Sequence, residues 1–136
     1  MAVWEPRMLS ILRIMTGLMF MEHGMSKLFN FPPGTMHPAF PALLWFAGVL
    51  ECFGGALVAL GLFTRVVAFL LSGEMAIGYF MFHFPKSFFP LLNGGDAAVL
   101  YSFVFLYLAL AGGGEWSLDR LRASAGTTVA PARSSA

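Results

Sequence analysis

Four long apolar stretches, separated by short breaks rich in proline, glycine or polar residues, dominate the pattern along this chain. A helix that crosses the hydrocarbon core of a membrane needs about 20 mostly apolar residues. The pattern predicts such helices over residues 8–29, 42–63, 65–84 and 95–112. The expected fold is therefore an all-α, four-helix transmembrane bundle.

The breaks carry residues that end or begin helices. Pro32 and Pro33 follow the first stretch, and proline cannot continue a helix because it lacks the amide hydrogen. A tight turn joins the second stretch to the third, with Thr64 as the expected N-cap of the next helix. Asn93 as a cap and Asp96 in the first turn both favour the start of the fourth helix.

Composition supports a membrane location. The chain is 58% hydrophobic and 11% charged, with a mean hydropathy of +0.76. Soluble domains average about 45–50% apolar and about 25% charged residues. The net charge of +1 and the lack of a basic patch argue against nucleic acid as a partner. We predict one membrane domain over residues 1–119, followed by a short polar, disordered cytoplasmic tail over residues 120–136.

Positive charges are distributed unequally over the predicted loops. Only Lys27 and Lys86 fall on the side opposite the termini. The arginines on the side of the termini and of the tight turn are Arg7, Arg13, Arg65, Arg120, Arg122 and Arg133. Cytoplasmic loops carry an excess of lysine and arginine. Both termini are therefore expected in the cytoplasm.

Several charged residues fall inside the predicted spans, where a charge at the bilayer centre costs roughly 2.5–3.5 kcal/mol. On the first helix, Arg13, His23 and Lys27 share a face that should point into the bundle. Glu22 lies on the far side and would meet a neighbouring helix, a partner subunit or lipid headgroups. For Arg13 and Arg65, close to the cytoplasmic face, snorkelling toward the interface is the favoured interpretation.

The third helix is harder to orient. Ser72 and His83 lie on one stripe, and Glu74 lies roughly opposite. Either this helix has polar neighbours on two sides, or it is kinked near Gly73 or Gly78.

Most of the polar residues fall toward the outer half of the predicted bundle, which suggests a pocket that opens outward. Glu51 lies near mid-membrane and would form its floor. The residues of this candidate ligand and proton pocket are His23, Lys27, Glu51, Glu74, Tyr79, His83 and Asp96. No metal site is expected, because the lysine beside the histidines repels a cation.

The motifs around these residues carry a family resemblance. They are His23-Gly24-Met25-Ser26-Lys27, Ala47-Gly48-Val49-Leu50-Glu51, Gly61-Leu62-Phe63-Thr64-Arg65, Ser72-Gly73-Glu74-Met75-Ala76, Asn93-Gly94-Gly95-Asp96 and Trp116-Ser117-Leu118-Asp119. Through them the chain resembles the bacterial DoxX family over all but its tail. Asp96 stands where many relatives carry Glu, which keeps the carboxylate.

The resemblance implies a redox component of the bacterial inner membrane. Some members resemble subunits of a thiosulfate:quinone oxidoreductase, and others are linked to membrane complexes that defend against oxidative and thiol stress. Distant eukaryotic relatives are similar to assembly factors for other membrane proteins.

Two functions from different classes fit these observations. The first is a redox-linked membrane subunit that binds a quinone or similar small lipid-soluble carrier, together with a partner protein or as a homo-oligomer. Quinone reduction takes up protons, and acids, histidines and tyrosine supply suitable groups. The chain has no complete catalytic constellation, so it would be at most a subunit of an oxidoreductase complex.

The alternative is a non-enzymatic scaffold or assembly factor, whose intramembrane charges are structural. A thiol-disulfide enzyme is disfavoured because Cys52 has no resolving partner.

Overall fold

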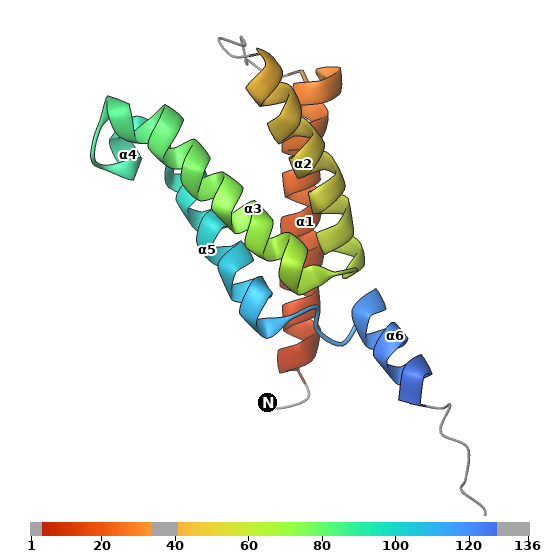
Figure 1. Cartoon of the computed structure of the whole chain (residues 1–136). Coiled ribbons are helices and arrows are strands. Elements are labelled where there is room, and N and C mark those ends of the chain that lie inside the picture. Colours follow the sequence, from red (N-terminus) through yellow and green to blue (C-terminus); the bar gives the residue numbers. More distant parts are fainter. Residues whose placement is uncertain (1–3, 34–40, 128–136) are drawn as a thin grey trace, which may run out of the picture.

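The computed structural model describes residues 4–33 and 41–127, which form helices joined by short turns, with no strand among them (Figure 1). The elements are α1 (Glu5–Phe29), α2 (Pro41–Leu60), α3 (Thr64–Gly78), the π-helix η1 (Tyr79–His83), the 3-10 helix η2 (Phe84–Lys86), α4 (Pro90–Asn93), α5 (Asp96–Ala111) and α6 (Leu118–Thr127). The prediction of an all-α fold is confirmed. The four long apolar stretches correspond to α1, to α2, to α3 with η1 and η2, and to α5.

Two helical segments in the described ranges are long and apolar enough to cross a membrane. They are Pro41–Leu60 and the continuous segment Thr64–Lys86. Asp96–Ala111 is apolar but shorter. Helix α1 has 25 residues, more than any other helix, and the charges of Arg13 and Glu22 lower its mean hydropathy.

The long helices associate as two pairs. Helices α1 and α2 pack along each other, as do α3 and α5. The pairs meet at the end of the molecule that carries the start of α1 and α6, and they diverge toward the end that carries α4 (Figure 1). A small apolar core fills the junction between the pairs, formed by Phe20, Val58, Ala68, Leu71, Phe105 and Leu108.

Glycines allow the backbones of α1 and α2 to approach closely, as their spacing on α2 predicted. A Cβ added to Gly17 would lie 2.6 Å from the amide nitrogen of Ala59 and 2.7 Å from the carbonyl oxygen of Gly55. A Cβ on Gly55 would lie 2.7 Å from the amide nitrogen of Met21. A side chain at either position would therefore force the two helices apart.

Helix α3 has polar neighbours on two sides, which was one of the two alternatives left by the sequence. Ser72 faces α5, where its hydroxyl donates to the carbonyl oxygen of Ser102 at 2.8 Å, and the Ser102 hydroxyl donates back to the Ser72 carbonyl at 3.1 Å. Glu74 instead lies within electrostatic reach of residues from α1 and α2. The regular α-helical turn also ends at Gly78, where the π-helix η1 begins.

Arg13 is fully buried, so the prediction that it snorkels toward the interface was wrong. Its guanidinium donates to the carbonyl oxygens of Gly113 at 2.7 Å, Val58 at 2.6 Å and Trp116 at 2.6 Å, and also to that of Ala59. The last residues of α2 and the turn after α5 thus converge on one side chain of α1. Partners inside the protein replace the water that the guanidinium would otherwise seek.

Arg65, by contrast, is exposed. Its guanidinium donates to the carbonyl oxygen of Leu110, near the end of α5, at 2.6 Å. This position is compatible with the interfacial placement expected for Arg65.

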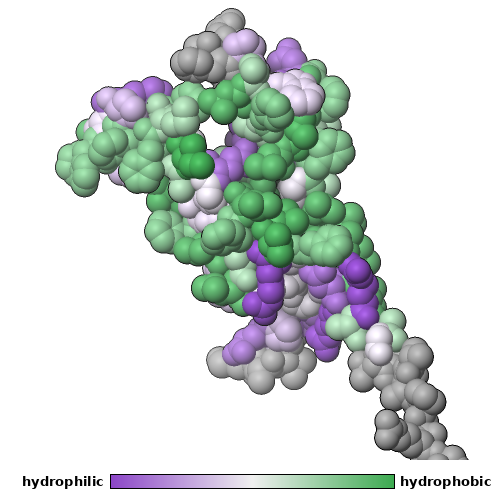
Figure 2. Space-filling model, in the orientation of Figure 1, coloured by the Kyte–Doolittle hydropathy of each residue, from purple (hydrophilic) through white to green (hydrophobic). Residues whose placement is uncertain are grey.

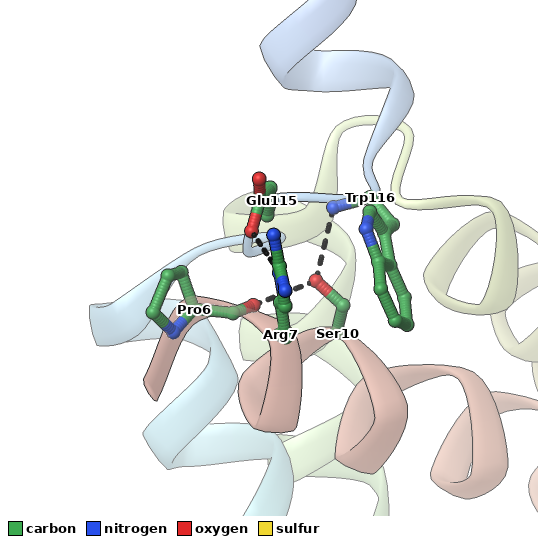
Figure 3. Close-up of polar contacts among 5 residues, drawn as sticks. All are labelled: Pro6, Arg7, Ser10, Glu115 and Trp116. Carbon is green, nitrogen blue, oxygen red and sulfur yellow. Dashed lines mark hydrogen bonds and ion pairs between the residues drawn. The ribbon is translucent and has the colours of Figure 1, made fainter. Parts of the chain in front are cut away.

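The start of α1 is also tied to the segment between α5 and α6 (Figure 3). The Ser10 hydroxyl donates to the carbonyl oxygen of Pro6 at 2.8 Å and accepts from the amide of Trp116 at 3.0 Å. Arg7 pairs with Glu115 at 3.1 Å. The two ends of the helical domain are therefore held together at this end of the molecule.

Asp119 caps α3, in place of the N-cap role expected of Thr64. The helix begins after Phe63, whose φ of 52° is left-handed, and Thr64 is its first residue. The Asp119 carboxylate accepts from the amides of Phe63 and Thr64, each at 2.8 Å. Burial raises the pKa of this carboxyl, but the hydrogen bonds and the charge of Arg122 outweigh that effect and hold its pKa below the usual 3.8.

Residues 120–127, which the sequence predicted to be disordered, continue helix α6. The Ser117 hydroxyl accepts from the amide of Arg120 at 3.3 Å, which stabilises the first turn. Leucine, arginine and alanine within α6 are good helix formers. The rest of the predicted tail, residues 128–136, lies outside the described ranges.

Gly17→Ala should weaken the packing of α1 on α2, because its Cβ would collide with backbone atoms. We expect a loss of about 1–3 kcal/mol in unfolding free energy, the usual cost of overpacking, measured by denaturant unfolding in detergent micelles. Gly73→Ala is the matched control: Gly73 is exposed within α3 and its Cβ would meet nothing within 4 Å. This variant should be as stable as the wild type or more stable by about 0.5–1 kcal/mol. Equal effects at the two positions would contradict the packing assignment.

Candidate functional site

An ion pair joins α1 to α2 in the interior of the helical domain. Lys27 Nζ donates to Glu51 Oε1, with the side chains only 14% and 1% exposed. The second oxygen, Glu51 Oε2, is buried and has no hydrogen-bond partner among the described residues. Glu51 therefore has one oxygen held by lysine and one available to another donor.

Glu74 of α3 brings a second carboxylate to this ion pair. Both of its oxygens are buried and lack a partner within residues 4–33 and 41–127. Its carboxylate lies within electrostatic reach of Glu51 and Lys27. Two carboxyl groups thus lie within electrostatic reach of one lysine.

Tyr101 of α5 completes the cluster, although the sequence analysis did not select it. Its hydroxyl is buried and has no partner in the described part of the chain. Its ring centroid lies 5.2 Å from that of Phe20 and 5.8 Å from that of His23. The Tyr101 hydroxyl is within electrostatic reach of Glu51 and of Glu22. The signal that could have found it is a tyrosine inside a mostly apolar span.

We use the term acidic cleft for the site formed by His23, Lys27, Glu51, Glu74 and Tyr101. Figure 2 shows an opening between the α3–α4 part of the molecule and the α1–α2 pair, with hydrophilic surface at its edge. The surface around the opening is mostly hydrophobic (Figure 2). Because the two helix pairs diverge on this side, an apolar molecule could enter between them.

The remaining predicted residues lie elsewhere. Tyr79 and His83 belong to a local network in the η1–α4 region: His83 Nδ1 lies 3.1 Å from the Asn93 carbonyl oxygen, and Asn93 Nδ2 lies 3.3 Å from the Tyr79 hydroxyl. Asn93 Nδ2 also donates to the carbonyl of Ser87 at 2.8 Å. Asp96 is exposed at the start of α5. The structure therefore brings His23, Lys27, Glu51 and Glu74 together and places Tyr79, His83 and Asp96 outside that group.

A separate concave surface occurs near the termini, lined by residues that include Arg65, Gly113 and Arg120. None of the residues of the acidic cleft lines it. Within the described ranges, no three histidine, cysteine, aspartate or glutamate side chains are grouped as metal ligands.

The long apolar helices Pro41–Leu60 and Thr64–Lys86 are of the kind found in α-helical membrane proteins. The chain belongs to the DoxX family, whose model matches residues 8–84. This confirms the resemblance drawn from the sequence motifs.

Three bacterial proteins are similar to the chain over most of its length. An uncharacterized protein of Haemophilus influenzae is 43% identical over 85% of this chain and 91% of its own. An uncharacterized membrane protein of Mycobacterium tuberculosis is 31% identical over 94% of this chain and 88% of its own. CatD of Bacillus subtilis, named as a candidate oxidoreductase, is 32% identical over 80% of this chain and 82% of its own. No solved structure matches the chain.

Removing one member of the Lys27–Glu51 pair should have asymmetric effects. Lys27→Gln leaves the fully buried Glu51 without its cation, and we expect a loss of about 3–5 kcal/mol in unfolding free energy. Glu51→Gln should cost less, because the partly exposed Lys27 can reach toward water. The double variant Lys27→Gln/Glu51→Gln should recover most of the stability lost by Lys27→Gln. Denaturant unfolding of the four proteins measures this cycle, and additive losses would show that the two side chains do not interact.

Proposed function

We propose that the protein is a redox-linked membrane subunit that binds a quinone or a similar small lipid-soluble carrier in the acidic cleft. The observation that carries the proposal is the set of buried oxygens, on Glu51, Glu74 and Tyr101, that have no hydrogen-bond partner among the described residues. Leaving a buried polar group unsatisfied costs about 1–3 kcal/mol, and more for a charged group. A ligand with a polar head and an apolar body would satisfy these groups and match the hydrophobic surroundings.

The residue types suit the protonation chemistry of such a carrier. Reduction of a quinone to a quinol takes up two electrons and two protons. Lys27 and Tyr101 would donate hydrogen bonds to the carbonyl oxygens, and Glu51 and Glu74 would exchange protons with the hydroxyls. The electrons would come from a redox centre on a partner subunit, because the single Cys52 cannot form a dithiol. The name of the Bacillus subtilis relative is in keeping with an oxidoreductase complex.

For the membrane arrangement we propose four spans in the bacterial inner membrane, with both termini in the cytoplasm. The support is the excess of arginines at the termini and in the turn between α2 and α3. In this arrangement the helix pairs diverge toward the outer face, and the acidic cleft opens in the outer half of the bilayer.

Reporter fusions test this topology. After Ala136, a reporter that works only in the cytoplasm should be active and one that works only outside should be inactive. Near His37, the reverse result is expected. Both sites lie outside the described residues, so neither insertion interrupts a helix of residues 4–33 and 41–127. Activity of an external reporter at Ala136 would exclude the arrangement.

Quinone binding can be tested by mass spectrometry of small molecules that co-purify with the full chain in mild detergent. Wild-type protein should retain a bound quinone, and Glu51→Gln should retain much less of it. Asp96→Asn, which removes an exposed carboxylate outside the cleft, should retain the wild-type amount. Membrane levels of the three proteins are compared on a blot, so that loss of ligand is not confused with loss of protein.

The alternative function remains a non-enzymatic scaffold or assembly factor. The Lys27–Glu51 pair would then be a structural tie between α1 and α2. This alternative expects a co-purifying protein without any quinone, and a Glu51→Gln variant that still binds that protein.

A further inference from the structure

Helix α1 carries an exposed stripe on the side that faces away from α2. Its packing on α2 uses the opposite side, where Gly17 lies against Gly55 and Ala59. At about 100° per residue, five exposed residues fall within an arc of about 80°. We call this set the α1 seam: Met8, Leu12, Met15, Met19 and Glu22. Their spacing alternates between four and three residues, which is the repeat of helices that pack along each other.

Glu22 distinguishes this stripe from a surface that only contacts lipid. It precedes Phe29, the last residue of α1, by about 10 Å along the helix. A glutamate side chain is shorter than that, so headgroups beyond the helix end cannot solvate its carboxylate. The hydroxyl of Tyr101 lies within electrostatic reach of Glu22, but no hydrogen bond joins them. Ionisable residues inside a span almost always face a partner, and Glu22 forms no ion pair with another described residue.

The residue next to Glu22 can provide that partner from a second copy of the chain. His23 is also exposed, and its ring nitrogens can donate to a carboxylate. It cannot donate to Glu22 of its own helix, because adjacent residues of a helix do not face each other. Two copies inserted in the same orientation are related by a two-fold axis along the membrane normal, so residues at equal depth meet. In a parallel pair, a seam residue packs beside the residue that follows its counterpart.

We infer that a second copy of this chain covers the α1 seam, with two reciprocal Glu22–His23 hydrogen bonds across the two-fold axis. The chain supplies both members of each pair at the same depth. The exposed face of α2 offers no such pairing, because it is apolar and the charged residue of that helix, Glu51, is buried. The interface brings Glu22 of the second copy to His23, a member of the acidic cleft. The inference uses the proposed membrane arrangement and does not depend on binding of a carrier.

Cysteine crosslinking of the full chain in bacterial membranes tests the seam, with Cys52→Ala as a background that has no other thiol. Met15→Cys places a thiol on the seam. Leu60→Cys places one on α2 at a similar depth, because Ala59 packs beside Gly17. The native side chains are 52% and 56% exposed, so access of the oxidant is matched. A disulfide requires Cα atoms within about 7 Å, so oxidation should give a covalent dimer with Met15→Cys and none with Leu60→Cys.

The reciprocal pairs are tested by energy transfer between fluorescent proteins fused after Ala136, with the full chain in liposomes. Glu22→Leu removes both acceptors and keeps the seam apolar. A polar contact between membrane helices changes a dissociation constant about threefold on average, so loss of both should weaken the dimer about tenfold. The exchange variant Glu22→His/His23→Glu restores both pairs with donor and acceptor reversed. Its dissociation constant should return to within about threefold of the wild type.

Met19→Cys gives a second crosslinking position on the seam, should Met15→Cys fail to accumulate. No crosslink at either seam position, or an equal one at Leu60→Cys, would overturn the interface. A product that does not have twice the chain mass of 14.8 kDa would show that another protein covers the seam, and would overturn the second copy. Dimers of equal strength in the wild type and Glu22→Leu would overturn the reciprocal pairs. Retention of quinone is measured separately, so each of these results leaves the proposed function standing or failing on its own test.

Discussion

The hydrogen bonds of Arg13 are the interaction on which the arrangement of the helices depends. A guanidinium that is fully buried must satisfy its donors inside the protein, and here it does so on backbone carbonyls from the end of α2 and from the turn after α5. The carbonyls in the last turn of a helix lack the usual intrahelical amide partner, and the Arg13 guanidinium donates to those of Val58 and Ala59. One side chain of α1 thereby fixes the end of the molecule where the two helix pairs meet.

The acidic cleft follows from this one-sided anchoring. Arg13, the Ser10–Trp116 bond and the Asp119 cap all act at the same end of the domain. Toward the other end, α1 and α2 stay together through glycine contacts, and α3 and α5 are joined by paired serine bonds. The two pairs are therefore free to diverge away from the anchored end, and Glu51 and Glu74 lie in different pairs within electrostatic reach of each other.

Comparing the buried Arg13 with the acidic residues Glu51 and Glu74 distinguishes a structural residue from candidate site residues. Arg13 has its hydrogen bonds satisfied by the protein, so no ligand is needed to explain its burial. Glu51 and Glu74 retain oxygens without partners in the described ranges. We therefore take the cleft, and not the Arg13 network, as the candidate site, because, of the two, only the cleft has buried polar atoms without hydrogen-bond partners among these residues.

The sequence by itself determined the all-α class, the positions of the long apolar helices and the family, because hydrophobic length and helix-breaking residues are local properties. It also selected His23, Lys27, Glu51 and Glu74, since a charge within an apolar span is visible without any neighbours. It could not separate these from Tyr79, His83 and Asp96, and it missed Tyr101. Only the tertiary structure decided that Arg13 is buried, that Asp119 caps α3 across 55 positions of sequence, and that Glu74 lies within electrostatic reach of the Lys27–Glu51 pair. The physical reason is that helical periodicity orients a residue on its own helix, whereas the partner it meets depends on how separate helices pack.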